Sequence, residues 1–415
     1  MKRLLLLPFA LLLVLFVACQ APTTPVTTTE TPLATPTVAP ATETVAAPAE
    51  TPTVEPAPAT PTMEAPATET STPEVTAANG FDYLVDPYYA ESGGWQLRGA
   101  RRTAAGGWET VLVPLSESIS VGGVDYAPAS HRALIWDYSG NQGAGPSNLS
   151  AGPLYRVDLA TGSVETLFPG NVVNARWAPD GQGYGYLLAT EETYELHVRD
   201  AAGEDRVVAR DVPREFTFSP DGSALAFSRE SGYGLPGAPG LYVVDLASGA
   251  EQMLGDVDRA GTGGSGSAWA PLWSPDGASL LLRAFADGSD RLTWAARDGS
   301  WSHALLLDDL DGAAGAALGQ ENVCTNQEFL LTGPTTLLTG AGPCPDEPLM
   351  GAMAEATDLV LLELDPAQGT LAPAGTIPAP AATFFFLGYR PQSNSVVLHS
   401  PADPVNTAIY EVMLP

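Results

Sequence analysis

The chain alternates apolar and polar residues in short runs, and signals for tight turns separate these runs. Three times an aromatic residue is followed within three positions by Pro-Asp-Gly and then by an alternating apolar run, from Trp177, Phe218 and Trp273. In such a turn Pro presets φ, Asp accepts backbone hydrogen bonds, and Gly closes the turn. A period of two predicts that each motif joins two short antiparallel strands. We therefore assign structural turn roles to Asp180, Gly181, Asp221, Gly222, Asp276 and Gly277.

Further hairpins are predicted by the same alternation of strands and short turns. Second hairpins with short turns begin at Leu154, Leu241 and Leu359. Degenerate copies of the first hairpin begin at Val124, Glu328 and Phe385. Two consecutive hairpins make a four-stranded antiparallel sheet, which is one blade of a β-propeller. The sequence therefore predicts an all-β repeat array.

On these motifs the chain resembles the TolB-type, WD-repeat-like β-propellers, whose blades carry a W/F-S-P-D-G turn between their first two strands. The resemblance implies a six-bladed β-propeller of four-stranded blades over residues 80–415. We expect the strand Ile409–Met413 to close the ring by pairing with a strand near Trp108–Pro114. The segment Phe81–Arg102 leaves enough strand for seven blades. By analogy, the family implies protein interaction at the cell envelope.

The N-terminus predicts export. Lys2 and Arg3 precede the apolar run Leu4–Ala18, which is shorter than the about 20 residues of a spanning helix. The sequence ending at Cys19 resembles a bacterial lipobox, although Phe16 stands where Leu is usual. This resemblance implies a signal peptide over residues 1–18, a lipid on the Cys19 thiol, and a place on the outer face of the cell membrane or envelope. An ordinary secretory signal, cleaved elsewhere, is the alternative.

Residues 19–79 predict a disordered tether. After Cys19 the segment consists almost only of Thr, Pro, Ala, Glu and Val, with no aromatic or basic residue. Such a composition cannot bury a core and favours extended chain. The tether would hold the propeller away from the membrane.

The excess of acidic residues limits the classes of molecule that the protein can bind. The chain has 48 acidic residues, 18 basic ones and a formal net charge of −30. The single lysine, Lys2, lies in the predicted signal peptide. So acidic a surface repels nucleic acid and anionic headgroups, so we expect no nucleic-acid partner. The simpler interpretation of the negative charge is that it only keeps the protein soluble. We expect the protein to be a monomer.

The two remaining cysteines predict a disulfide. Cys324 and Cys344 flank a degenerate hairpin, and pairing about a turn at 333–336 would bring them opposite each other. A pair of catalytic or metal-binding thiols is less consistent with an exported chain.

The sequence lacks the motifs of several enzyme classes. No G-x-S-x-G elbow is present, and without a lysine after the signal peptide neither a P-loop nor Schiff-base chemistry is available. The four histidines are His131, His197, His303 and His399. Their spacing does not match a set of metal ligands, so we expect them to be structural. The acidic segment Asp308–Gly312 lacks the order of a calcium loop and is read as a solvated turn. We expect no metal and no cofactor. A glycosidase-like site of two carboxylates stays open.

Function is expected in the parts that do not repeat. Turns between the first and second strands, and between the third and fourth, are tight and share one face, whereas the connections on the other face are long and irregular. We expect binding contacts from Trp136, Tyr138, Arg229, Tyr233 and Arg259, because aromatic and Arg residues dominate binding hot spots. The sequence thus favours a membrane-anchored lipoprotein that binds a protein, peptide or glycan. The alternatives are an extracytoplasmic hydrolase or lyase, and a purely structural surface lipoprotein.

Overall fold

The computed structural model describes residues 81–90, 93–116, 119–137, 141–145, 149–230, 235–256, 267–268, 270–286, 289–345, 355–401 and 407–415. They belong to one unit, Thr72–Pro415. The predicted signal peptide, Cys19 and the predicted tether lie outside the described residues. In the described part of the chain, no helix is long and apolar enough to span a bilayer.

The described residues form antiparallel strands, the short 3-10 helix η1 (Pro128–Ser130) and the helix α1 (Leu307–Leu318). The strands are β1 Tyr83–Tyr89, β2 Trp95–Arg102, β3 Trp108–Pro114, β4 Gly123–Ala127, β5 Arg132–Trp136, β6 Asn141–Ala144, β7 Leu149–Asp158, β8 Val164–Trp177, β9 Tyr184–Ala189, β10 Tyr194–Arg199, β11 Asp205–Arg210, β12 Phe216–Phe218, β13 Ala224–Arg229, β14 Gly240–Asp245, β15 Glu251–Gly255, β16 Ser267–Ala268, β17 Leu272–Trp273, β18 Ser279–Ala286, β19 Ser289–Ala296, β20 Ser302–Leu306, β21 Val323–Leu331, β22 Thr336–Pro343, β23 Asp358–Asp365, β24 Thr370–Pro378, β25 Phe385–Arg390, β26 Ser395–Pro401 and β27 Thr407–Met413.

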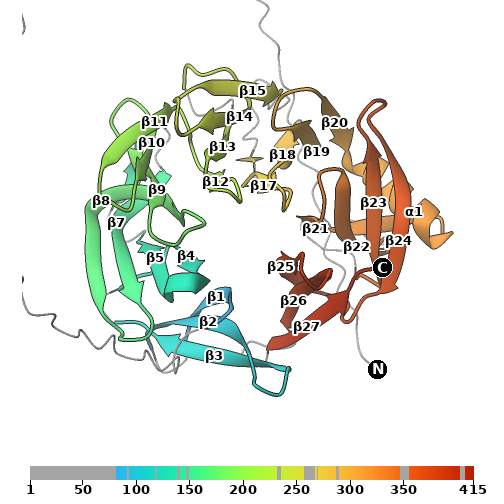
Figure 1. Cartoon of the computed structure of the whole chain (residues 1–415), viewed down its shortest axis with the longest axis horizontal. Coiled ribbons are helices and arrows are strands. Elements are labelled where there is room, and N and C mark those ends of the chain that lie inside the picture. The colour runs from blue at the N-terminus through green and yellow to red at the C-terminus, as the bar shows by residue number, and fades with distance from the viewer. Residues whose placement is uncertain are drawn as a thin grey trace, which may run out of the picture. The chain divides into compact units, whose positions relative to one another are not determined.

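These strands form a ring of blades in chain order (Figure 1). Blade 1 is β1–β3, blade 4 is β12–β15, blade 5 is β16–β20, blade 6 is β21–β24 and blade 7 is β25–β27. The long strand β8 belongs to two blades. Its first half pairs with β7 in blade 2 (β4, β5, β7), and its second half pairs with β9 in blade 3 (β9–β11). A left-handed residue, Asn171 with φ 61°, lies between the two halves.

The described residues thus form a β-propeller of seven blades, so the preferred count of six was wrong and the alternative holds. Blade 1 carries no Pro-Asp-Gly turn, so the repeat pattern did not reveal it. The predicted pairing of Ile409–Met413 with Trp108–Pro114 was also wrong. Within the described chain, β3 pairs with β2, and β27 pairs with β26. Blades 1 and 7 instead meet through side chains, including the ion pair of Arg102 with Glu411 at 3.4 Å.

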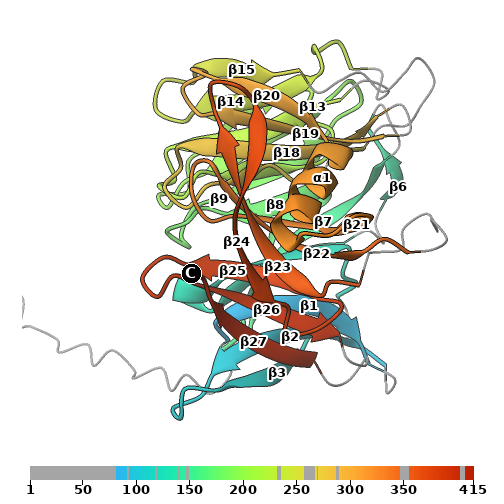
Figure 2. The same cartoon turned by 90° about the vertical axis from the view of Figure 1, so that its right-hand side faces the viewer.

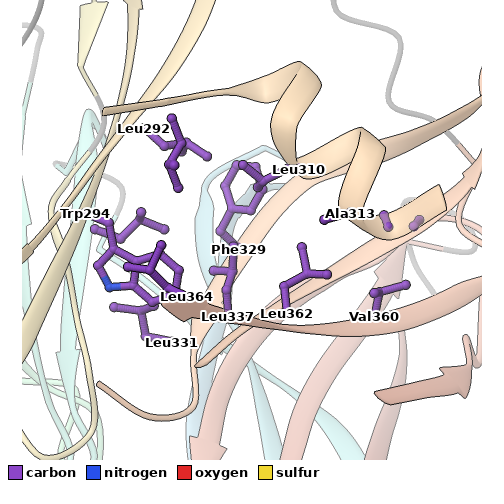
Figure 3. Packing of buried hydrophobic residues seen from close by; sticks show 14 of the residues in the cluster. Leu292, Trp294, Leu310, Ala313, Phe329, Leu331, Leu337, Val360, Leu362 and Leu364 are labelled. Carbon is purple, nitrogen blue, oxygen red and sulfur yellow. The ribbon is translucent and has the colours of Figure 1, made fainter. Parts of the chain in front are cut away.

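Helix α1 connects blade 5 to blade 6 and packs over an apolar cluster (Figures 2 and 3). Leu310, Ala313 and Ala314 follow the spacing of one helical face and are buried against Trp294 and Phe329. At its start, the Asp309 carboxylate accepts a hydrogen bond from the Leu306 amide at 2.8 Å. The segment Asp308–Gly312 is therefore the beginning of a helix, and its prediction as a solvated turn was wrong.

Candidate functional site

The strands are connected differently at the two ends of the ring, and we call one end the tight-turn face. Here the three motif turns close on themselves. The amides of Gly181, Gly222 and Gly277 donate to the carbonyl oxygens three residues earlier at 2.8–2.9 Å, with φ between 65° and 70°. The Asp221 carboxylate accepts the Ser219 hydroxyl at 2.5 Å and the Ser223 amide at 3.0 Å. Asp180 and Asp276 accept turn amides in the same way.

The other end is the long-connection face, where the segments 137–148, 230–239, 256–271 and 344–357 connect the blade strands, two of them including the short strands β6 and β16. Tyr138, Tyr233 and Arg259 belong to these segments but lie outside the described residues. Their part in binding stays a prediction.

Trp136 and Arg229 lie at the ends of strands rather than in the long connections, and their part in binding stays a prediction. Trp136 is the last residue of β5 and is 5% exposed, because its ring packs against Gly123. Arg229, at the end of β13, forms an ion pair with Glu251 at 2.5 Å. Its guanidinium also lies 4.4 Å from the centre of the Tyr242 ring. Both side chains stabilise their blades.

An exposed aromatic pair lies at the long-connection face, at the tip of the β1–β2 hairpin of blade 1. Tyr89 and Trp95 stand directly opposite each other in the strand register, and their ring centres are 5.3 Å apart. Tyr89 is 59% exposed, and Trp95 is partly exposed. The turn beyond them contains Gly93 and Gly94, with φ of 89° and 95° that favour glycine. We call Tyr89 and Trp95 the aromatic pair.

The other side of this hairpin carries a charge pair in which the arginine is buried and the carboxylate is exposed. Arg98 donates from Nε and Nη2 to the two carboxylate oxygens of Asp86 at 2.7 and 2.6 Å. The Arg98 guanidinium also lies 5.4 Å from the centre of the Tyr88 ring. Bidentate pairs of this kind are geometrically specific, and the Arg98 side chain is 8% exposed. The pair therefore fixes the twist and register of the hairpin that presents the aromatic pair.

His399, on strand β26 of blade 7, lies near the charge pair of Arg98 and Asp86. The imidazole stacks on Phe385 at 5.2 Å between ring centres. Burial lowers the pKa of His399, while the charges of Asp86 and Arg98 act on it in opposite directions. His399 therefore packs at the junction of the last and first blades, where burial favours its neutral form.

A polar network joins the innermost strands of blades 2, 3 and 4. Arg176 on β8 lies 3.7 Å from the Asp125 carboxylate and 3.2 Å from the Glu215 carboxylate. Asn174 donates to Glu215 at 2.9 Å, and the Trp177 amide donates to Asp125 at 2.7 Å. Each contact passes from one blade to the next, so the network holds the blades together.

Carboxyl groups with a raised pKa are spread over different elements. Burial raises the pKa of Glu328 on β21 to about 7, opposed by Arg283. Burial also raises the pKa of Asp125 on β4 and of Asp311 in α1. The charged side chains that act on these pKa values are Arg176 for Asp125, Asp308 for Asp311 and Arg283 for Glu328, so none of the three carboxyl groups acts on another.

The remaining histidines have partners that account for them. His131 contacts the Tyr126 hydroxyl at 3.1 Å, His197 contacts the Asp205 carboxylate at 3.0 Å, and His303 contacts the Pro366 carbonyl oxygen at 2.8 Å. Among the described residues, no three His, Cys, Asp or Glu side chains are grouped to hold a metal ion.

Cys324 and Cys344 form a disulfide with their Cα atoms 4.8 Å apart. The strand register pairs Cys324 with Gly342 rather than with Cys344, because an irregularity between Thr325 and Phe329 shifts β21. The bond links the two ends of the first hairpin of blade 6.

The sequence reasoning missed the aromatic pair because it searched only the longest connections. A signal was present in the segment from Tyr88 to Trp95, where aromatic residues flank Gly93-Gly94 on both sides. A short connection that contains Gly predicts a hairpin, and a hairpin places its flanking aromatic residues opposite each other.

Comparisons with known proteins found similar solved structures but no family. No protein-family model and no curated protein matches the sequence. Among solved structures, TolB from Acinetobacter baumannii is 15% identical, covering 75% of this chain and 75% of that one with a TM-score of 0.35. Oligogalacturonate lyase from Vibrio parahaemolyticus is 13% identical, covering 81% and 91% with a TM-score of 0.42. The β-propeller domain of the Trilobed protease from Pyrococcus furiosus is 11% identical, covering 80% and 95% with a TM-score of 0.41.

Proposed function

We propose that this propeller binds a protein, peptide or glycan through its long-connection face, and that a lipid on Cys19 anchors it to the outer face of a membrane. The observation that carries the binding proposal is the aromatic pair. Tyr89 and Trp95 present apolar ring surface beside hydroxyl and indole N–H groups, a combination enriched at binding surfaces.

The bidentate Arg98–Asp86 pair supports this assignment, because it holds the two strands of the hairpin together next to the two rings. Preorganised aromatic side chains lose little conformational entropy on binding. The long segments around the same face, with Tyr138, Tyr233 and Arg259, would add further contacts.

A binding role is favoured over a hydrolase or lyase. The carboxyl groups with a raised pKa are distributed over β4, α1 and β21 and are not coupled to each other. The acidic composition opposes a nucleic-acid partner, and we expect the propeller to act as a monomer.

Cross-linking capture from native membranes, with the full chain, tests both parts of the proposal. Tyr89→Ala combined with Trp95→Ala should lose most of the partner captured by the wild type, about tenfold or more. The control Leu112→Ala, 45% exposed on the outer strand β3, should capture normally. Cys19→Ser should move the protein from the membrane to the soluble fraction. Equal capture by both variants would refute the binding site, and membrane retention of Cys19→Ser would refute the anchor.

A further inference from the structure

A cavity of about 240 Å³ lies on the tight-turn face, between blades 3 and 4. Turns on both sides of the blade boundary form its walls, from Ala178–Tyr184 and Arg199–Glu204 in blade 3 to Gly222 and Leu246 in blade 4. Pockets for drug-sized ligands are usually larger, about 300–1,000 Å³. The cavity is therefore suited to a smaller molecule. It lies on the opposite face from the aromatic pair.

One side of this cavity is apolar with a single hydroxyl. Val198, Phe218 and Leu246 line it together with Tyr184, which is 5% exposed. Burial raises the pKa of the Tyr184 hydroxyl, and the neighbouring Arg199 guanidinium acts in the opposite direction. The phenol is therefore protonated and available as a hydrogen-bond donor.

Two guanidinium groups reach the same cavity. Arg199 stands opposite Tyr184 in the register of β9 and β10, and Arg206 lies on β11. Arg206 donates to the Leu246 carbonyl oxygen across the blade boundary. Neither arginine forms an ion pair with a carboxylate of the described residues, whereas Arg98, Arg176 and Arg229 do. Arginines without a carboxylate partner in so acidic a protein are suited to bind a carboxylate ligand.

Three acidic residues, Asp180, Asp200 and Glu204, line the cavity beside these arginines. Asp180 Oδ1 accepts the amides of Gln182 and Gly183 at 2.9 and 3.2 Å. Asp200 Oδ1 accepts the amides of Ala202 and Glu204 at 2.9 and 3.0 Å. The turns thus hold the carboxylates of Asp180 and Asp200 in place. Fixed negative charges attract an ammonium group and disfavour a ligand with several negative charges.

We infer that this cavity binds a small zwitterion of the amino-acid class. Its carboxylate lies against Arg199 and Arg206, its ammonium group faces Asp180 and Asp200, and its apolar side chain contacts Phe218 and Leu246. This inference is independent of the proposed binding role of the opposite face.

Calorimetry with the common L-amino acids, one at a time, tests the inference on the wild-type protein. The best binder is then compared with the amine that lacks its carboxylate and with its N-acetyl derivative, which lacks the ammonium charge. Both derivatives should bind about tenfold or more weakly. If no amino acid binds, or if either derivative binds as tightly as its parent, the assignment is overturned.

Substitutions provide a second readout. Arg199→Gln and Arg206→Gln should each weaken the binding of the amino acid by about tenfold. The matched control is Arg156→Gln, which removes the same charge from blade 2, where Arg156 pairs with Glu165. Thermal unfolding of each variant checks that the blades are intact. Unchanged affinity in both cavity variants would contradict the proposed contacts.

Discussion

At the scale of single residues, the fold sets the ionisation of side chains by burial and by turn geometry. The hydroxyl of Ser219 and the amide of Ser223 hold the pKa of Asp221 well below its usual range. Burial in blade 6 instead raises the pKa of Glu328 from 4.5 to about 7, against the effect of Arg283. A carboxyl group with a raised pKa favours folding only while it is protonated.

Glu328 should therefore make stability depend on pH. Below pH 4.5 its carboxyl group is protonated in both the folded and the unfolded chain, and the stabilising contribution is complete. That contribution is lost as the pH rises from 4.5 through about 7. Relative to the wild type, Glu328→Gln should be more stable at pH 8 than at pH 4.5, measured by urea unfolding. Glu165→Gln is the exposed control, and an equal difference at both pH values for Glu328→Gln would contradict the prediction.

The roles of some single residues could be predicted from the sequence, and those of others could not. The turn roles of Asp221 and Gly222 follow from local chemistry, which the chain carries within a few positions. Burial of Trp136 against Gly123 depends on strand direction and packing between strands. Residue type alone therefore did not reveal that Trp136 is buried at the end of β5.

At the scale of elements, hairpins were predictable and the helix was not. Pro-Asp-Gly and Gly-containing turns between alternating runs locate most inner hairpins before any tertiary contact is known. The segment that forms α1 is rich in Asp, Gly and Ala, and its local composition favours a turn. It becomes helical because Leu310, Ala313 and Ala314 are buried on blade 6.

The first hairpin of blade 6 should depend on its disulfide. Cys324 and Cys344 are 20 residues apart, and closing a loop of this size restricts the unfolded chain. Cys324→Ser combined with Cys344→Ser should lower the free energy of unfolding by about 3 kcal/mol. Urea unfolding of the variant and of the oxidised wild type measures this loss. Unchanged unfolding midpoints would show that the bond adds no stability.

At the scale of the whole molecule, the seven blades separate two faces with different properties. Repeated turns form one face, so the repeat pattern located it from the sequence. The aromatic pair depends on blade 1, which lacks the repeat and joins blade 7 through side chains such as Arg102 and Glu411. Its position could not be derived from motifs, because the number of blades and the way the ring closes decide which hairpin tips lie together.

The most direct test of binding at the long-connection face is site-specific photo-cross-linking in native membranes. A benzophenone amino acid is placed at Tyr89 or, as a control, at Met253, which is 40% exposed on the outer strand β15. The account predicts a specific cross-linked adduct from position 89 and none from position 253. No adduct from position 89, or an adduct from position 253 alone, would contradict it.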